Sequence, residues 1–372
     1  MTLSRAIAAA VDEFGEVLMA YPHRRIDIAE SAVMKGEPRR YPVLCLGHAP
    51  DDDATPPPTT PIFADPEQRL LERLRGLPGP LEMHNPICPR LGLGHGPGTL
   101  AASFGIELDP QLGYTPKGER LIDELLAEGM PDPETSGVIP QMRSDIEAAL
   151  ALTPDWIEIA PPDMQGPFNI AHMLLGTEVF TLPMTDPDKF NRLMSIITDF
   201  FLTLDSNLHR WIGPARFPKF PTYTGRIAEC SVNMMSAKTY EKFVLPHDLR
   251  IATQHGHVTI HPCSGPHVFR STLHNLPNVV FTEAGFIEKA YAGSISVDDA
   301  LQEIGDRKII LSLGQELPEG REEEFIRCDL DRARTNPRLI FAYTGMHWRS
   351  KDQKQIKQIH IRLDDYWERN IV

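Results

Sequence analysis

The sequence has few cysteines, no long apolar run and too few basic residues to balance its acids. Five cysteines, an odd and widely spaced set, do not make the framework of a small disulfide-rich protein. No stretch approaches the roughly 18 apolar residues of a membrane-spanning helix, and acids interrupt the first apolar run, which makes it a poor signal peptide. A net charge of -14 argues against nucleic acid or a membrane surface as partner. These absences predict a reduced, cytoplasmic protein.

The sequence also lacks a GxGxxG motif that opens a first strand–helix turn, which counts against a doubly wound dinucleotide-binding sheet. From about residue 140 short apolar strands alternate with helical patterns, as in parallel βαβ units. Such units in a chain of 372 residues predict an α/β fold, a (β/α)8 TIM barrel. We expect residues 1–36 to form an N-terminal helical extension and residues 37–372 a single barrel domain, with the doubly wound sheet as the alternative.

Local signals place the elements of this barrel. Strands are expected at 39–47, 156–160, 217–224, 257–263, 278–284, 307–314 and 338–345. An Asp/Pro-rich loop is expected at 48–64. Helices are expected at 65–77, at 144–152 with Ser144 as its cap, from Asp186 to about His209, from Ser236 to about His255, and at 266–275, 296–305 and 320–335.

Candidate metal ligands end several of these strands. His261 and Cys263 lie two residues apart, so their side chains share one face of a strand. Glu283 ends the next strand, and His347 follows the last one. Functional groups of a parallel barrel gather at the carboxyl ends of its strands, and zinc accepts nitrogen, sulfur and oxygen ligands. We therefore predict a zinc site made of His261, Cys263, Glu283 and His347.

Other polar residues are expected around the same mouth of the barrel. We expect Asp163 to take part in catalysis together with Glu283, and His255 to be solvated at a helix end. The residues expected to bind substrate follow the predicted strands: Gln165, Asn169, His172, Tyr223, Arg226 and Gln315.

Four segments resemble the uroporphyrinogen decarboxylase superfamily. They are Gln165-Gly-Pro-Phe-Asn-Ile-Ala-His-Met-Leu-Leu-Gly176, Ser236-Ala-Lys-Thr-Tyr-Glu-Lys-Phe-Val-Leu-Pro246, the His-x-Cys-x-Gly strand from His261, and Gly305-Asp-Arg with the strand that follows. The resemblance spans about residues 155–350 and implies a TIM barrel. The arginine-bearing segment MRQAGRY of the decarboxylases is missing. The resemblance is therefore closer to the branch of zinc methyltransferases that work with corrinoid proteins.

In that branch a His-x-Cys pair, a carboxylate about twenty residues on and a late cysteine hold the zinc. His261, Cys263 and Glu283 match this pattern, whereas the late cysteine falls on or beside Met346, next to His347. The resemblance implies methyl transfer between a corrinoid (cobalamin) on a partner protein and a small molecule. The alternatives are a cofactor-free decarboxylase or other lyase of a polycarboxylate, and a non-catalytic metal-binding barrel. An acidic surface on such a barrel allows a homodimer.

Overall fold

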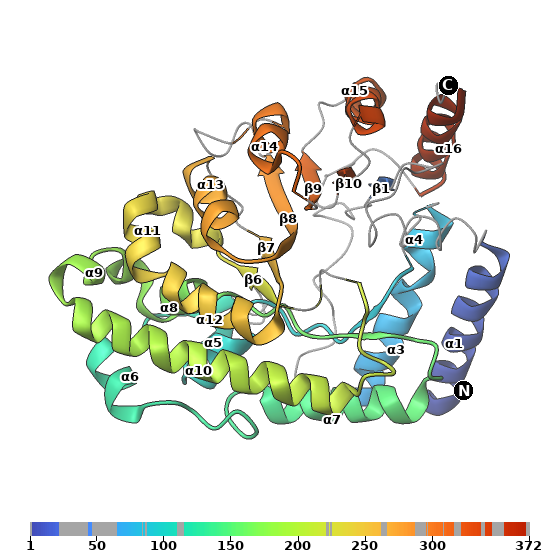
Figure 1. Ribbon diagram of the computed structural model, residues 1–372. Helices are drawn as coiled ribbons and strands as arrows, with labels where there is room; N and C mark the ends of the chain where they lie inside the picture. Colours follow the sequence, from blue (N-terminus) through green and yellow to red (C-terminus); the bar gives the residue numbers. More distant parts are fainter. Residues whose placement is uncertain are drawn as a thin grey trace.

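The computed structural model describes residues 2–21, 44–46, 65–83, 85, 88–109, 115–220, 223, 225–261, 266–286, 295, 297–307, 309–315, 321–335, 339–343 and 353–369. The fold is mixed α/β, with many helices and short strands (Figure 1). Among the helices that these ranges contain, none is both long enough and apolar enough to cross a membrane.

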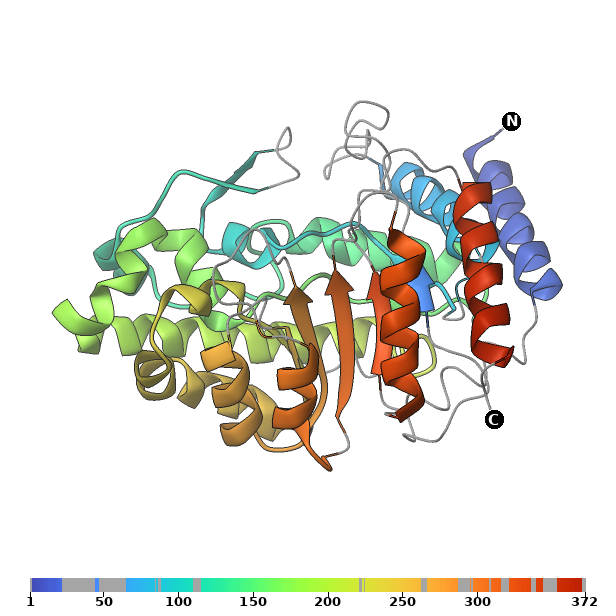
Figure 2. The same ribbon diagram turned by 90° about the horizontal axis from the view of Figure 1, so that it is seen from above.

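Six parallel strands form the main sheet, in the order β1-β10-β9-β8-β7-β6. The orange strands of Figure 2 show how their arrows point the same way, so their carboxyl ends share one edge. The strands are β1 (Leu44–Leu46), β6 (Arg226–Ala228), β7 (Val258–His261), β8 (Val279–Phe286), β9 (Ile310–Gln315) and β10 (Leu339–Tyr343). The first of these strands therefore lies beside the last.

Two further parallel strands, β2 (Leu91–Gly92) and β5 (Ile159–Ala160), form a separate pair. A parallel bridge between Gln165 and Ala228 joins the chain after β5 to the end of β6. This bridge brings the separate pair next to the main sheet. Within the described residues no pairing joins β1 to β2, so closure of the barrel stays a prediction. An antiparallel hairpin, β3 (Glu107–Asp109) and β4 (Thr115–Lys117), lies outside both sheets.

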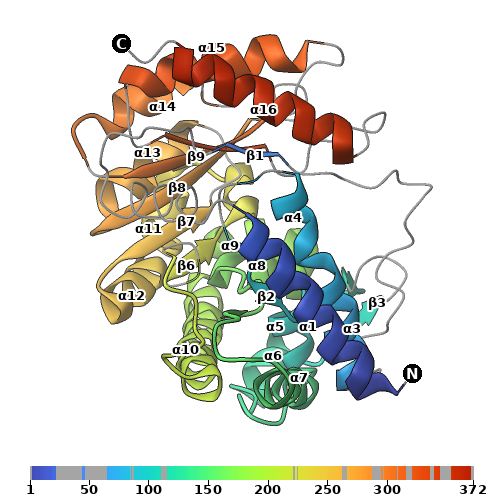
Figure 3. The ribbon, with the colours of Figure 1, turned by 90° about the vertical axis from the view of Figure 1, so that its right-hand side faces the viewer.

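The helices are arranged around the strands, and α15 and α16 lie together along the side of the sheet that holds β1 (Figures 1 and 3). The helices are α1 (Leu3–Ala20), α3 (Pro66–Gly76), α4 (Pro78–Glu82), α5 (Thr99–Ser103), α6 (Ile122–Glu128), α7 (Ile139–Leu152), α8 (Pro167–Leu175), α9 (Leu182–Thr185), α10 (Pro187–Ile212), α11 (Ala237–Phe243), α12 (Leu245–His255), α13 (Pro266–Asn275), α14 (Val297–Ile304), α15 (Glu322–Thr335) and α16 (Gln353–Arg369), with short 3-10 helices η2 (Gly176–Phe180) and η4 (Cys230–Met234).

Helix α10 is the longest element and supports the half of the sheet that carries the site. Asp186 caps it by accepting a hydrogen bond from the Lys189 backbone N–H at 3.1 Å, as the sequence predicts. One face of α10 is completely buried and packs against α8, α12, α7 and α6. Its large apolar side chains, each worth about 1.5–3 kcal/mol when buried, anchor these helices; they are Phe190, Leu193, Met194, Ile197, Phe200, Phe201, Leu204 and Leu208.

Three predicted elements differ from the structure. Helix α7 begins at Ile139 and not at Ser144, because Pro140 fits its first turn; the Ser144 hydroxyl instead donates to the Pro140 carbonyl within the helix. The segment predicted as a strand at 217–224 contains prolines, which lack the N–H of a ladder, and the strand here is β6, from Arg226. The helix predicted from Ser236 divides at Val244, before Pro246, into α11 and α12.

Candidate functional site

The carboxyl ends of β5, β6, β7 and β8 lie next to one another and define the candidate site. The Gly166 N–H donates to the Ala228 carbonyl at 2.8 Å, and the Glu229 N–H donates to the His261 carbonyl at 3.0 Å. Ile260 pairs with Thr282, so the next residues, His261 of β7 and Glu283 of β8, stand at the same level of the sheet. Residues far apart in the sequence are thereby brought to one edge.

A chain of hydrogen bonds runs along this edge. Arg226 Nη1 donates to Asp163 Oδ1 at 3.1 Å, and Gln165 Nε2 donates to Asp163 Oδ2 at 3.1 Å. Asn169 Nδ2 then donates to Gln165 Oε1 at 2.7 Å. The amide of Gln165 thus bridges a carboxylate and an amide, so its orientation is fixed at both ends.

The chain continues through a residue that the sequence did not indicate, Ser231. Its backbone N–H donates to Asn169 Oδ1 at 2.8 Å, and its hydroxyl lies 2.8 Å from His172 Nδ1. Burial lowers the pKa of His172, which favours the neutral imidazole. Five of the six residues predicted to bind substrate or act in catalysis between 163 and 226 therefore lie in one hydrogen-bonded chain: Asp163, Gln165, Asn169, His172 and Arg226.

Tyr223, the sixth, lies elsewhere. It precedes β6 instead of following a strand, and the Arg90 guanidinium lies 6.0 Å from the centre of its ring. Arg90 itself precedes β2, so Tyr223 stands at the amino end of the strands. Arg226 is the first residue of β6 and forms an ion pair with Asp163 at 3.1 Å. This ion pair partly neutralises the Arg226 charge and so weakens its attraction for an anionic substrate.

A buried carboxyl group that the sequence did not reveal, Glu229, holds the start of α8. The residue is completely buried, and its two oxygens accept the backbone N–H groups of Phe168 and Asn169, each at 3.0 Å. A carboxylate is well placed here because the amino end of a helix carries partial positive charge and unpaired N–H groups. The misplaced strand at 217–224 hid this residue, which directly follows the true strand β6.

A second buried acid lies near Glu229. Burial raises the pKa of Asp248 to about 7, although the Tyr240 hydroxyl donates to its Oδ2 at 2.8 Å. Burial, and then the Asp248 charge, raise the pKa of Glu229 well above its ordinary value. The two carboxyl groups cannot both be ionised cheaply in a dry interior, so this part of the molecule can hold a proton near neutral pH.

The end of β2 carries another buried set, made of Arg69, His95 and Asp145. His95 Nε2 lies 2.7 Å from Asp145 Oδ2, and Arg69 Nη2 lies 3.0 Å from the same oxygen. Burial lowers the pKa of His95, so the ring is neutral while the arginine balances the carboxylate. The His95 carbonyl accepts the Asp163 N–H at 3.3 Å, which ties this set to the hydrogen-bonded chain.

The predicted zinc ligands are described only in part. His261 is the last residue of β7 and is half-buried, and Glu283 lies within β8. Gln315 is the last residue of β9, where its backbone pairs with Phe286. Cys263 and His347 lie outside the described residues.

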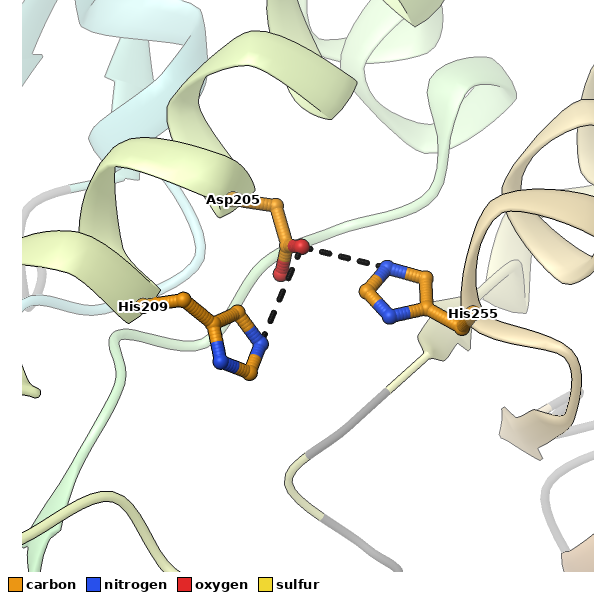
Figure 4. Close-up of side chains that lie close together, drawn as sticks. All are labelled: Asp205, His209 and His255. Atoms are coloured by element: carbon orange, nitrogen blue, oxygen red, sulfur yellow. Dashed lines mark ion pairs between the residues drawn. The ribbon is translucent and has the colours of Figure 1, made fainter. Parts of the chain in front are cut away.

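Among the described residues a different group has ligand atoms close enough to hold a metal ion: Asp205, His209 and His255 (Figure 4). The prediction that His255 is solvated is wrong. Its side chain is only 11% exposed and its Nε2 lies 3.1 Å from Asp205 Oδ2. It ends α12 and so precedes β7, whereas His261 ends that strand.

No protein-family model matches this chain, and no curated protein does. Among solved structures, the chain is similar to a methyltransferase from Methanosarcina mazei, with a TM-score of 0.63 and 16% sequence identity. The match covers 90% of this chain and 97% of the other. At 16% sequence identity the similarity concerns the fold alone. Membership of the uroporphyrinogen decarboxylase superfamily therefore stays a prediction. The chain therefore shares, over nearly its whole length, the mixed α/β fold of a methyltransferase.

Proposed function

We propose that the protein is a zinc-dependent methyltransferase that moves a methyl group between a corrinoid carried by a partner protein and a small molecule. The observation that carries the proposal is the meeting of β5–β8 at one edge, where the hydrogen-bonded chain and His261 lie, in a fold similar to that of a methyltransferase. We further propose that β1 and β2 close the strands into a (β/α)8 barrel, whose sites lie at this edge.

The proposed metal site fits zinc by the chemistry of its donors. His261, Cys263, Glu283 and His347 offer two nitrogens, a sulfur and an oxygen, a set that zinc accepts. His261 and Glu283 stand level on neighbouring strands, which is the placement that two ligands of one ion need. Bound zinc would supply the Lewis acidity that lowers the pKa of a coordinated thiol or hydroxyl group.

The remaining residues of the edge are proposed to bind and orient the small molecule. The amide of Gln165 and the imidazole of His172 are already oriented by Asp163, Asn169 and Ser231, so they lose little freedom when a substrate binds. The pairing of Arg226 with Asp163 reduces the positive charge that Arg226 can offer a substrate, which favours an uncharged or singly charged substrate over a polycarboxylate.

Cobalt substitution tests the metal site. The protein is loaded with Co2+, and the thiolate-to-cobalt charge-transfer band is recorded for wild type, His261→Ala and Cys263→Ser. We expect the band in wild type and its loss in Cys263→Ser. The matched control is Cys328→Ser, since Cys328 is a free, exposed cysteine on α15. A wild-type protein without this band would rule out thiolate ligation and the zinc mechanism with it.

Activity is then tested with free methylcobalamin as the methyl donor and a panel of thiols and phenols as acceptors. Cleavage of the cobalt–carbon bond is followed by its optical absorbance. We expect this cleavage to require zinc, and its rate to be at least about a hundredfold lower in His261→Ala than in wild type. Release of carbon dioxide from a porphyrinogen polycarboxylate without metal would instead support the decarboxylase alternative. Metal binding without either reaction would support a non-catalytic barrel.

A further inference from the structure

Asp205, His209 and His255 form a compact group that the proposed reaction does not use. Asp205 and His209 lie one turn apart on α10, and His255 is the last residue of α12. Figure 4 shows both imidazole rings with a nitrogen turned toward the Asp205 carboxylate. The Asp205 Oδ2 atom lies 3.1 Å from His255 Nε2 and 3.9 Å from His209 Nε2, and the three ligand atoms lie within 4.8 Å of one another.

The hydrogen bonding of this group is incomplete. Both Nε2 atoms, of His209 and of His255, are buried and make no hydrogen bond. A buried polar atom without a hydrogen bond destabilises the folded state, and two such atoms beside one carboxylate need an explanation. An ordinary ion pair would align a ring N–H with the oxygen. Two imidazole nitrogens close to one carboxylate, neither of them hydrogen-bonded to it, are instead an arrangement that a bound cation would satisfy.

The spacing suits a small divalent ion. Zinc binds imidazole nitrogen and carboxylate oxygen at about 2.0–2.2 Å, so in a tetrahedral site neighbouring ligand atoms lie roughly 3.3 Å apart. The two measured separations from Asp205, 3.1 and 3.9 Å, lie on either side of this value. His209 is the most exposed of the three, at 37%, so its ring has room to close the longer distance and water can reach the remaining position.

The surroundings hold the ligands in place. The His209 ring stacks on buried Phe217, with ring centres 3.8 Å apart and planes 15° from parallel. The His257 ring lies 6.4 Å from that of His255.

We propose that Asp205, His209 and His255 bind one zinc ion, or a similar late first-row divalent cation, that joins α10 to the end of α12. The site lies before the amino end of β7, whereas His261 lies at its carboxyl end, so the two metal sites are separate. In barrel enzymes groups at the amino ends of the strands serve stability, and we assign this ion a structural role.

The test uses full-length protein with His261→Ala and Cys263→Ser, which removes two ligands of the other proposed site. We expect this background to bind one Zn2+ per chain by isothermal titration calorimetry and to melt at a higher temperature with zinc than with chelator. Bound Co2+ should show ligand-field bands without a thiolate charge-transfer band. Because this background lacks His261 and Cys263, zinc binding in it reports only on the site made of Asp205, His209 and His255. A negative result here therefore leaves the proposed methyltransferase site untouched, and a negative result there leaves this site untouched.

Removing the ligands should remove the ion. In the same background His209→Asn should weaken zinc binding at least roughly tenfold, and His209→Asn with His255→Asn should abolish it together with the thermal shift. His274→Asn is the matched control, because His274 also faces a carboxylate, that of Glu303 at 3.4 Å, on an exposed surface. A background that binds no zinc, or binding that survives in the folded double variant, would overturn the proposal; circular dichroism of each variant without zinc establishes that it is folded.

Discussion

Among single residues, the buried Asp248 predicts how stability depends on pH. Its pKa is about 7 in the folded protein and near 3.8 when exposed, so the folded state binds the proton more tightly. The stabilisation that comes from the protonated Asp248 carboxyl group is fully present below about pH 4 and is lost as the pH rises toward 7. We therefore compare the free energy of unfolding of Asp248→Asn with that of wild type. The difference should shift in favour of the variant by roughly 2–3 kcal/mol between about pH 5 and pH 8.

Urea unfolding of both proteins at the two pH values measures this difference. The matched control is Asp12→Asn, because Asp12 is exposed on α1 and its carboxyl group lies in water before and after unfolding. Equal pH profiles for wild type and Asp248→Asn would show that the buried carboxyl group does not titrate in this range.

The buried amide of Asn169 leads to a second prediction about stability. Its side chain joins Gln165 to the Ser231 backbone, and Asn169→Ala removes the hydrogen bonds to Gln165 Oε1 and from the Ser231 N–H. We expect this variant to lose about 1–3 kcal/mol of unfolding free energy, by urea denaturation. Asn191→Ala, at an exposed position of α10, should stay within about 0.5 kcal/mol of wild type, and a similar loss in both would contradict the role of the buried amide.

The sequence indicated most of the side chains in the hydrogen-bonded chain of the candidate site, but not the residues that hold them in place. Asp163, Gln165, Asn169, His172 and Arg226 were predicted from their places after strands and from the resemblance. Ser231 and Glu229 escaped, because a serine and a glutamate carry no signal until the strand before them is placed correctly. The long-range partners of a polar group are set by strand order, which one-dimensional spacing does not contain.

Among the elements, the junction of β6 with α8 depends on a glycine. A Cβ atom added at Gly166 would lie 2.3 Å from Glu229 Oε1 and 2.4 Å from its Cδ, far inside contact distance. Gly166→Ala should therefore push Glu229 from the first turn of α8 and cost about 2 kcal/mol or more. Thermal unfolding checks this, with Gly76→Ala as the control, because nothing lies within 4 Å of a Cβ there. An unchanged melting temperature in Gly166→Ala would contradict the close packing.

The elements that the sequence predicted well are those with strong local signals. α13 matches its predicted range, 266–275, and α3 begins after the capping residue Asp65. The failures arose where local signals conflict with tertiary packing. At 217–220 the buried side chains of Phe217 and Phe220 suggested a strand, but they fill the core from an irregular segment. The last helix, α16, was not predicted at all, since its many charges obscure the apolar face that it buries.

For the whole molecule, α16 connects the two ends of the chain. It contacts α15, which precedes it, and also α4 and β1 near the start of the sequence. Leu363 is completely buried in this helix. We expect Leu363→Ala to cost about 2–4 kcal/mol in urea unfolding followed by tryptophan fluorescence and by circular dichroism, with coincident transitions.

Leu121→Ala is the control for this substitution, because Leu121 is 63% exposed and its truncation should change stability by less than about 0.5 kcal/mol. A separate early transition in Leu363→Ala would show instead that α16 unfolds alone.

The pairing of β1 with β10 also bears on how the chain is made. Leu44 aligns with Phe341, so during synthesis β1 leaves the ribosome long before its neighbour exists. Until then one edge of β1 is open to any other strand, including one from another nascent chain. Slow translation of the second half would prolong that exposure. The yield of soluble protein should therefore depend on how quickly the last strand follows the first.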